Sequence, residues 1–163
     1  MALSKGMQEA LNEQVKHEMF SSHLYLSMVT WLEANNWPGF ANWMKVQAKE
    51  ETSHAMKFFN HIFDRGGRVT LQSLEKPQSE FKSPLDIFEK ALEHEKFITG
   101  SINKLNDMAI RENDYATSSM LKWFIDEQVE EEKNAQKNVD DLRRAGDHLG
   151  GLLILDKNAK KRE

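Results

Sequence analysis

Polar residues interrupt the hydrophobic stripes of this sequence at six places where a three- and four-residue spacing predicts buried side chains. They are Glu18, Glu51, His54, Glu95, Gln128 and Glu131. A buried carboxylate without a partner is costly, and four carboxylates at one level of a core would repel one another strongly. The pattern therefore predicts that a positive group lies among these six residues.

An internal repeat relates the six positions to one another. Glu18 and Glu51 are separated by the same interval as Glu95 and Gln128. One constant shift along the chain places Glu18 on Glu95, Glu50 on Glu127, Glu51 on Gln128 and His54 on Glu131. Each of the six also falls near the midpoint of its own predicted helix, so we expect them to meet at one height of the fold.

Two of these residue pairs have a spacing that places both side chains on one face of a helix. Glu51 and His54 are three residues apart, and Gln128 and Glu131 repeat that spacing. Two such pairs, with one glutamate from each of two further helices, form the arrangement that holds two metal ions in a bundle core, although there the second pair is also Glu-x-x-His. Oxygen ligands with one imidazole suit iron or manganese.

Four residues beside these six have two open interpretations. Tyr25 lies one heptad beyond Glu18 and is either a packed core residue with a bonded hydroxyl or a redox or hydrogen-bonding partner of the metals. Glu50, Glu127 and Glu130 are either solvated surface residues or the ligands of a further metal site or entry path. The remaining histidines have no ligand spacing with the six.

The elements that must position these side chains are helices. The apolar spacing predicts helices over about residues 4–35, 38–65, 84–112 and 115–145, a short fifth helix over about 147–156, and a charged tail over 157–163. The first four predict an all-α four-helix bundle over about residues 4–145, within a single domain that spans residues 1–163. The connection over residues 66–83 reaches about 60 Å when extended at ~3.3 Å per residue, which favours a crossover that makes the second and third helices parallel.

Composition excludes several classes of function. The chain has 163 residues and a net charge of −4, which argues against a main role in holding nucleic acid or an anionic membrane. It has no cysteine, so disulfides, zinc ribbons, iron–sulfur clusters and thiol nucleophiles are excluded. No segment resembles a signal peptide or a membrane span, and a cytoplasmic protein is expected.

The sequence resembles the non-haem bacterial ferritins over essentially its whole length. The resemblance rests on Leu11-Asn12-Glu13-Gln14, Ser21-Ser22-x-Leu24-Tyr25-Leu26, Glu50-Glu51-x-x-His54 and Glu127-Gln128-x-Glu130-Glu131-Glu132-Lys133. It implies that Glu18, Glu51 and His54 bind one iron ion, and that Glu51, Glu95, Gln128 and Glu131 surround a second. It also implies a third site at Glu50, Glu127 and Glu130, and it matches Tyr25 to the tyrosine of the family's site.

The resemblance implies a ferroxidase that oxidises ferrous iron with dioxygen or peroxide and stores ferric mineral inside a shell of 24 copies. The haem-containing relatives carry a methionine and a histidine where this chain has Thr52 and Glu131, so no haem is predicted. Two alternatives stay open, which are a di-metal oxidase of the same fold without storage and a non-catalytic shell subunit. The second alternative predicts basic residues facing Glu18 and Glu95 on the inward stripes.

Overall fold

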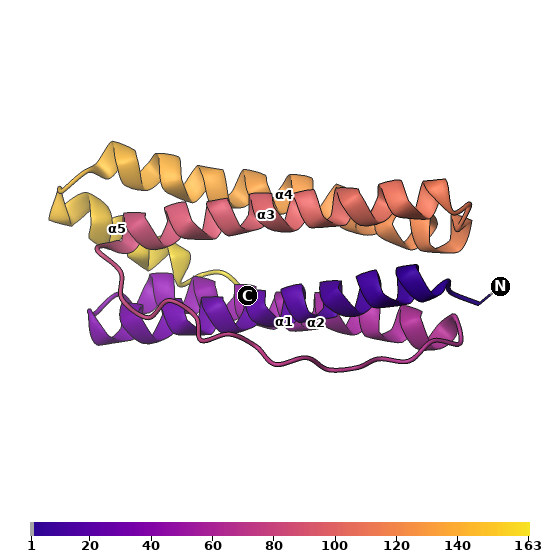
Figure 1. Cartoon of the computed structure of the whole chain (residues 1–163). Helices are drawn as coiled ribbons and strands as arrows, with labels where there is room; N and C mark the ends of the chain where they lie inside the picture. Colours follow the sequence, from indigo (N-terminus) through magenta and orange to yellow (C-terminus); the bar gives the residue numbers. More distant parts are fainter. Residues whose placement is uncertain (1) are drawn as a thin grey trace.

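Five helices and no strand make up residues 2–163, the part of the chain that this computed structural model describes. They are α1 (Lys5–Ala34), α2 (Pro38–Asp64), α3 (Pro84–Arg111), α4 (Tyr115–Ala145) and α5 (Leu149–Ala159). The predicted all-α bundle with a short C-terminal helix is confirmed (Figure 1). Within the described residues, no helix combines the length and the apolar character that a membrane span requires.

The helices begin and end at residues with the chemistry of helix caps. Ser4, Ser83, Asp114 and His148 each accept a hydrogen bond of 2.9–3.1 Å from the backbone N–H three residues further on. Gly66 follows the end of α2 with a φ of 71°, a left-handed conformation that glycine adopts without steric cost. These caps hold the helix boundaries close to those predicted from the sequence.

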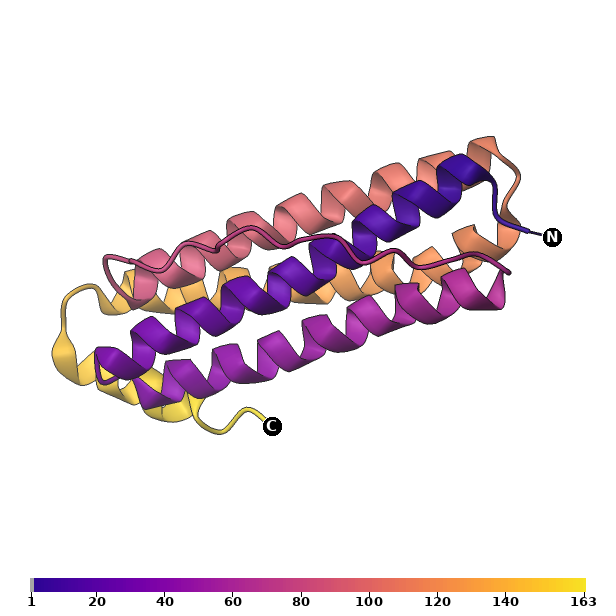
Figure 2. The same ribbon diagram turned by 60° about the horizontal axis from the view of Figure 1, so that its bottom comes forward.

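The topology is two antiparallel hairpins joined by a long crossover. α1 pairs with α2, and α3 pairs with α4 (Figure 1). The connection over residues 65–83 runs along α1 from one end of the bundle to the other, so α2 and α3 are parallel (Figure 2). The predicted crossover is therefore confirmed.

Side chains of α1 hold the crossover in place. Asn12 donates from Nδ2 to the carbonyl of Arg68 at 3.0 Å and accepts from the backbone N–H of Thr70 at 2.7 Å. Further along, Ser27 Oγ donates to the carbonyl of Gln78 at 2.6 Å. These contacts satisfy backbone groups that no helix or sheet would satisfy in an extended segment.

The apolar core is divided into two clusters, one at each end of the bundle. One cluster contains Met28, Leu32, Phe40, Met44 and Phe88, and the other contains Met7, Leu11, Phe58, Ile102 and Phe124. The six polar residues of the sequence analysis lie between these clusters along all four long helices. They occupy the middle of the bundle, as predicted.

Helix α5 closes one end of the bundle through a buried carboxylate. Asp156 Oδ1 accepts a 2.9 Å hydrogen bond from the backbone N–H of Phe40, in the first turn of α2, whose own N-cap residue Trp37 makes no side-chain bond. The negative charge also suits the positive end of the helix dipole. The sequence predicted a helix only to about residue 156, but α5 continues to Ala159 because residues 157–159 include no proline or glycine and Ala159 packs on the core.

Candidate metal centre

The four long helices bring the six predicted residues together in the middle of the bundle. Glu18 comes from α1, Glu51 and His54 from α2, Glu95 from α3, and Gln128 and Glu131 from α4. None of the six is more than 5% exposed. These residues are called the central polar cluster below.

Ligand atoms of the cluster converge in three groups. Within each group one donor atom per residue lies within 4.8 Å of the others. The groups are Glu18 with Glu51 and His54, Glu51 with Glu95 and Glu131, and His54 with Glu127 and Glu131. Glu51 belongs to the first two groups, so its carboxylate lies between two potential metal positions.

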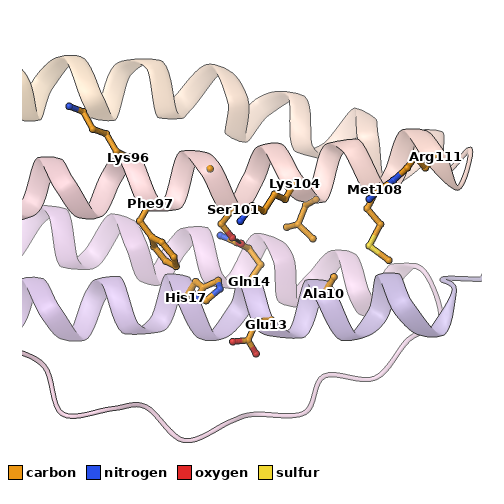
Figure 3. Close-up of a pocket in the computed structure, with 12 residues that line it drawn as sticks. Ala10, Glu13, Gln14, His17, Lys96, Phe97, Ser101, Lys104, Met108 and Arg111 are labelled. Atoms are coloured by element: carbon orange, nitrogen blue, oxygen red, sulfur yellow. Dashed lines mark hydrogen bonds between the residues drawn. The ribbon is translucent and has the colours of Figure 1, made fainter.

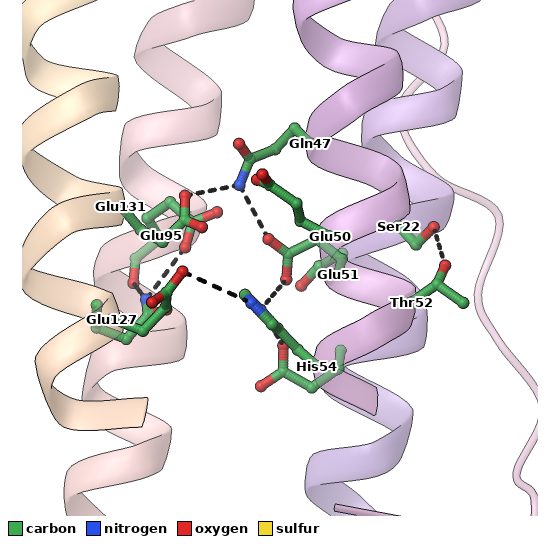
Figure 4. Close-up of polar contacts among 12 residues, drawn as sticks. Ser22, Gln47, Glu50, Glu51, Thr52, His54, Glu95, Glu127 and Glu131 are labelled. Carbon is green, nitrogen blue, oxygen red and sulfur yellow. Dashed lines mark hydrogen bonds and ion pairs between the residues drawn. The ribbon is translucent and has the colours of Figure 1, made fainter. Parts of the chain in front are cut away.

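The imidazole of His54 is oriented toward these carboxylates. Its Nδ1 lies 3.5 Å from Glu51 Oε2, and its Nε2 lies 4.0 Å from Glu127 Oε1. The rings of Trp123 and Phe124 pack edge-on against it, with centroids 5.5 and 5.8 Å away. Packing therefore limits the ring to an orientation in which both nitrogens face carboxylates (Figure 4).

Burial raises the pKa of each carboxyl group in the cluster. Desolvation is the main cause of the raised pKa of Glu18, and the charge of Glu51 adds to it. The pKa of Glu51 is raised well above its ordinary value by burial and then by Glu95 and Glu131. Burial, followed by the charge of Glu95, raises the pKa of Glu131 to about 7. A raised pKa means that protons compete with a bound cation for these carboxylates.

The cluster lacks an internal positive charge of its own. Among the described residues no lysine or arginine is buried, so the salt bridges that a non-catalytic subunit would need are not present. Oε2 of Glu18 is buried without any hydrogen-bond partner. An orphaned carboxylate oxygen beside an imidazole and further carboxylates fits a divalent cation.

Two glutamines that the sequence analysis did not assign to the site hold its carboxylates. Gln14 Nε2 donates to Glu18 Oε1 at 2.8 Å, and Gln47 Nε2 donates to Glu51 Oε1 at 3.0 Å. Each glutamine precedes its glutamate by four residues, and that shared spacing is the sequence signal that could have found them. Such partners orient metal ligands.

Tyr25 and Gln128 both donate hydrogen bonds to the carboxylate of Glu95. The Tyr25 hydroxyl donates a short hydrogen bond to Glu95 Oε1, and burial, followed by the charge of Glu95, raises the pKa of Tyr25 well above its ordinary value. Gln128 Nε2 lies 3.1 Å from Glu95 Oε2. The amide of Gln128 is therefore a hydrogen-bond donor to the carboxylate of Glu95 in this structure.

The three residues predicted for a further site are not equivalent. Glu127 reaches the cluster through His54, as described above. Glu50 is partly exposed, and Figure 4 shows its side chain extending from α2 toward Glu131. Glu130 is exposed and belongs to none of the potential metal groups found among the described residues.

A groove of about 610 Å³ lies on another face, between α1 and α3 (Figure 3). None of the six residues of the central polar cluster lines this groove, but one residue that does line it bonds to the cluster. Ser101 Oγ donates to Gln14 Oε1, and Gln14 in turn holds Glu18. The amide of Gln14 therefore connects this groove to the central polar cluster.

Comparison with known sequences finds relatives that match nearly the whole chain. The family model described as a ferritin-like domain matches residues 8–145. A bacterial non-heme ferritin of Staphylococcus haemolyticus is 41% identical over 160 residues, covering 98% of this chain and 96% of that protein. The bacterial non-heme ferritin of Staphylococcus aureus strain USA300 is 39% identical over 155 residues, covering 95% of this chain and 93% of that protein.

Comparison with solved structures agrees. An open pore ferritin from the hyperthermophilic archaeon Archaeoglobus fulgidus superposes with a TM-score of 0.98 at 46% identity, covering 99% of this chain and 100% of that chain. A closed form of that ferritin, engineered by site-directed mutagenesis, gives a TM-score of 0.98 at 46% identity, with 99% of both chains covered. The likeness therefore extends over the whole chain, in sequence and in fold.

Proposed function

This chain belongs to the ferritin family, and from that premise we propose that it oxidises ferrous iron at the central polar cluster and stores the ferric product. The observation that carries the proposal is the buried convergence of four carboxylates and one imidazole with no buried lysine or arginine among the described residues. Iron enters as substrate and leaves as cargo. No haem is part of the proposal.

Two ferrous ions have separate sets of ligands in this arrangement. Glu18, Glu51 and His54 would hold the first ion, and Glu51, Glu95 and Glu131 the second. Gln128 and Tyr25 would orient Glu95 from either side. A third and weaker position would use Glu127, Glu131 and Glu50.

The charges of the ligands explain why iron would be oxidised here. Each ferrous ion loses one electron, and the pair together supplies the two electrons that convert dioxygen to hydrogen peroxide with the uptake of two protons. Carboxylates stabilise the ferric ions more than the ferrous ions because the attraction grows with the charge of the cation. Burial strengthens that preference because it lowers the effective dielectric constant around the ligands.

Storage requires more than one copy of the chain, since a single bundle encloses no space for a mineral. We propose a closed shell of 24 copies. Helix α5 supports assembly, because Leu149, Leu153 and Ile154 on it are more than half exposed. Apolar side chains gathered in this way on a short helix are typical of surfaces that another subunit covers.

The test of the oxidase is aerobic oxidation of ferrous iron by the purified protein and by Glu51→Ala and His54→Ala variants. Both variants are expected to lose most of the oxidation rate. Glu93→Ala removes an exposed carboxylate from α3, two residues from Glu95, and is the matched control that should keep the parent rate. Parent-like rates in Glu51→Ala and His54→Ala would refute the site.

The size of the protein in solution, measured together with iron oxidation, distinguishes the proposed storage function from an oxidase without storage and from a non-catalytic shell subunit. An oxidase without storage would oxidise iron but elute from a sizing column near the mass of one or two chains. A non-catalytic shell subunit would elute as a large assembly but leave ferrous iron unoxidised. The proposed function predicts both a large assembly and oxidation.

A further inference from the structure

The C-terminal segment after α5 runs back along α2 (Figure 2). Asn42 Nδ2 donates to the carbonyls of Lys160 and Arg162, at 3.2 and 3.0 Å. Two backbone carbonyls near the end of the chain are thus held by one amide of α2. This contact places the side chain of Arg162 along the surface of α2.

The guanidinium of Arg162 makes three contacts with α2. Its Nη2 donates to Glu50 Oε2 at 2.7 Å, and its Nη1 donates to the carbonyl of Trp43 at 3.2 Å. The guanidinium carbon also lies 4.0 Å from the centroid of the Trp43 ring. A planar group held by a carboxylate, a carbonyl and an aromatic face is well oriented. Its side chain is only 20% exposed.

Glu50, the carboxylate that Arg162 holds, stands next to the ligands. It directly precedes Glu51 in sequence, and its side chain extends toward Glu131 (Figure 4). After burial and the charge of Glu95, the charge of Glu50 also raises the pKa of Glu131, which agrees with that placement. Arg162 is its one ion-pair partner among the described residues. Glu50 therefore lies between the guanidinium of Arg162 on one side and a potential metal position on the other.

We propose that Arg162 is a positioning residue that competes with a metal ion for Glu50. The inference rests on the proposed function and deepens it at the third position. A cation held by Glu127 and Glu131 gains Glu50 as a further ligand only when Arg162 releases it. The third ion is therefore held more weakly than the first two, which suits an ion in transit between the oxidation site and storage.

The experiment measures equilibrium binding of Zn²⁺, which has no redox chemistry, to the full-length metal-free protein by titration calorimetry. Arg162→Gln is expected to leave the first two equivalents per chain unchanged and to tighten the third roughly threefold, the effect of removing one partly exposed ion pair. Lys161→Gln is the matched control, since it removes the same charge from an exposed neighbour. It should bind as the parent does.

Two further variants separate competition from a structural role. Glu50→Gln should weaken the third equivalent and abolish the gain from Arg162→Gln in the double variant. Arg162→Lys keeps the charge but loses the forked contact, so its third equivalent should lie between those of the parent and Arg162→Gln. The melting temperature should be the same in all of them, because the contact involves only the end of the chain.

Two results would overturn the inference. One is a third equivalent that Arg162→Gln does not change, and the other is equal tightening in Arg162→Gln and Lys161→Gln, which would show a general effect of charge. Failure of the proposed function looks different, because Glu51→Ala would then leave the first two equivalents intact. The two failures are thus distinguishable in one set of titrations.

Discussion

Gln47 on α2 donates a 2.7 Å hydrogen bond from Nε2 to Oε2 of Glu131 on α4, across the middle of the bundle. The same amide nitrogen holds Glu51, so one side chain joins carboxylates from both hairpins. Oε1 of Gln47 is buried without a hydrogen-bond partner. A buried amide with one unsatisfied oxygen costs stability, which indicates that Gln47 serves the metal centre.

Replacement of Gln47 by leucine should weaken metal binding without unfolding the bundle. Glu51 and Glu131 lose their shared donor, and loss of such a partner lowers metal affinity about tenfold or more. Zn²⁺ titration of the metal-free protein measures the change. Gln136→Leu, which removes a glutamine whose hydrogen bond on α4 is solvent-exposed, should bind as the parent does. Equal affinity for Zn²⁺ in both variants would show that Glu51 and Glu131 do not need the hydrogen bonds from Gln47 in order to bind metal.

The stability of the metal-free protein should depend on pH through Glu131. Its pKa rises from an ordinary 4.5 to about 7 on folding. Between these values the unfolded chain has lost the proton and the folded chain keeps it, so unfolding releases a proton and stability falls as pH rises. Above a pH of about 7, Glu131 is ionised in both the folded and the unfolded state, so its unfavourable contribution to stability no longer changes with pH.

Glu131→Gln removes this penalty, since the amide is neutral at every pH. The variant should gain stability relative to the parent between pH 5 and 8, by up to roughly 3 kcal/mol, the free energy that corresponds to a pKa raised from 4.5 to about 7. Urea unfolding of both proteins in chelator, at a series of pH values, measures the difference. A difference that does not vary with pH would contradict the assignment.

Tyr25→Phe should make metal loading require a higher pH. Burial raises the pKa of Glu95, and the hydrogen bond from the tyrosine hydroxyl limits that rise. Without the hydroxyl, Glu95 keeps its proton to higher pH, and a proton competes with the metal. The midpoint of Zn²⁺ loading against pH is expected to move upward while the far-ultraviolet circular dichroism stays unchanged. An unmoved midpoint would assign Tyr25 to packing alone.

Gly39→Ala should dislodge α5. A Cβ atom at Gly39 would lie 1.6 Å from the backbone oxygen of Asp156, so one backbone must move. We expect loss of several kcal/mol of stability and loss of large assemblies on a sizing column. Gly100→Ala is the control, since its Cβ meets open space in the middle of α3 and should stabilise the protein by about 0.5–1 kcal/mol.

The residues of the central polar cluster could be singled out from the sequence because burial and charge conflict at their positions. A glutamate such as Glu95 on an apolar stripe has few explanations other than a cation, and the internal repeat links it to Glu18. The crossover was predictable for a simpler reason, because the connection is long enough to cover the length of a helix. Both predictions follow from local patterns and chain length.

The glutamines were missed because they do not follow the repeat. The shift that places Glu18 on Glu95 also places Gln14 on Ala91 and Gln47 on Phe124, so the second hairpin has no counterpart of either. The fold of Arg162 onto Glu50 could not be predicted either. A charged tail is ordinarily expected to be solvated, and only the docking of α5 brings its end to α2.

The division of ligands between the two hairpins gives the protein an order of events during its synthesis. Glu18, Glu51 and His54 all belong to α1 and α2, so the ligands proposed for the first ion are complete once these helices pair. The second ion needs Glu95 and Glu131, which come from α3 and α4. Because a chain emerges from the ribosome N-terminus first, the proposed two-ion oxidation would begin only after the second hairpin has docked. A chain with only its first hairpin would thus lack the ligands of the second ion and with them the proposed oxidation.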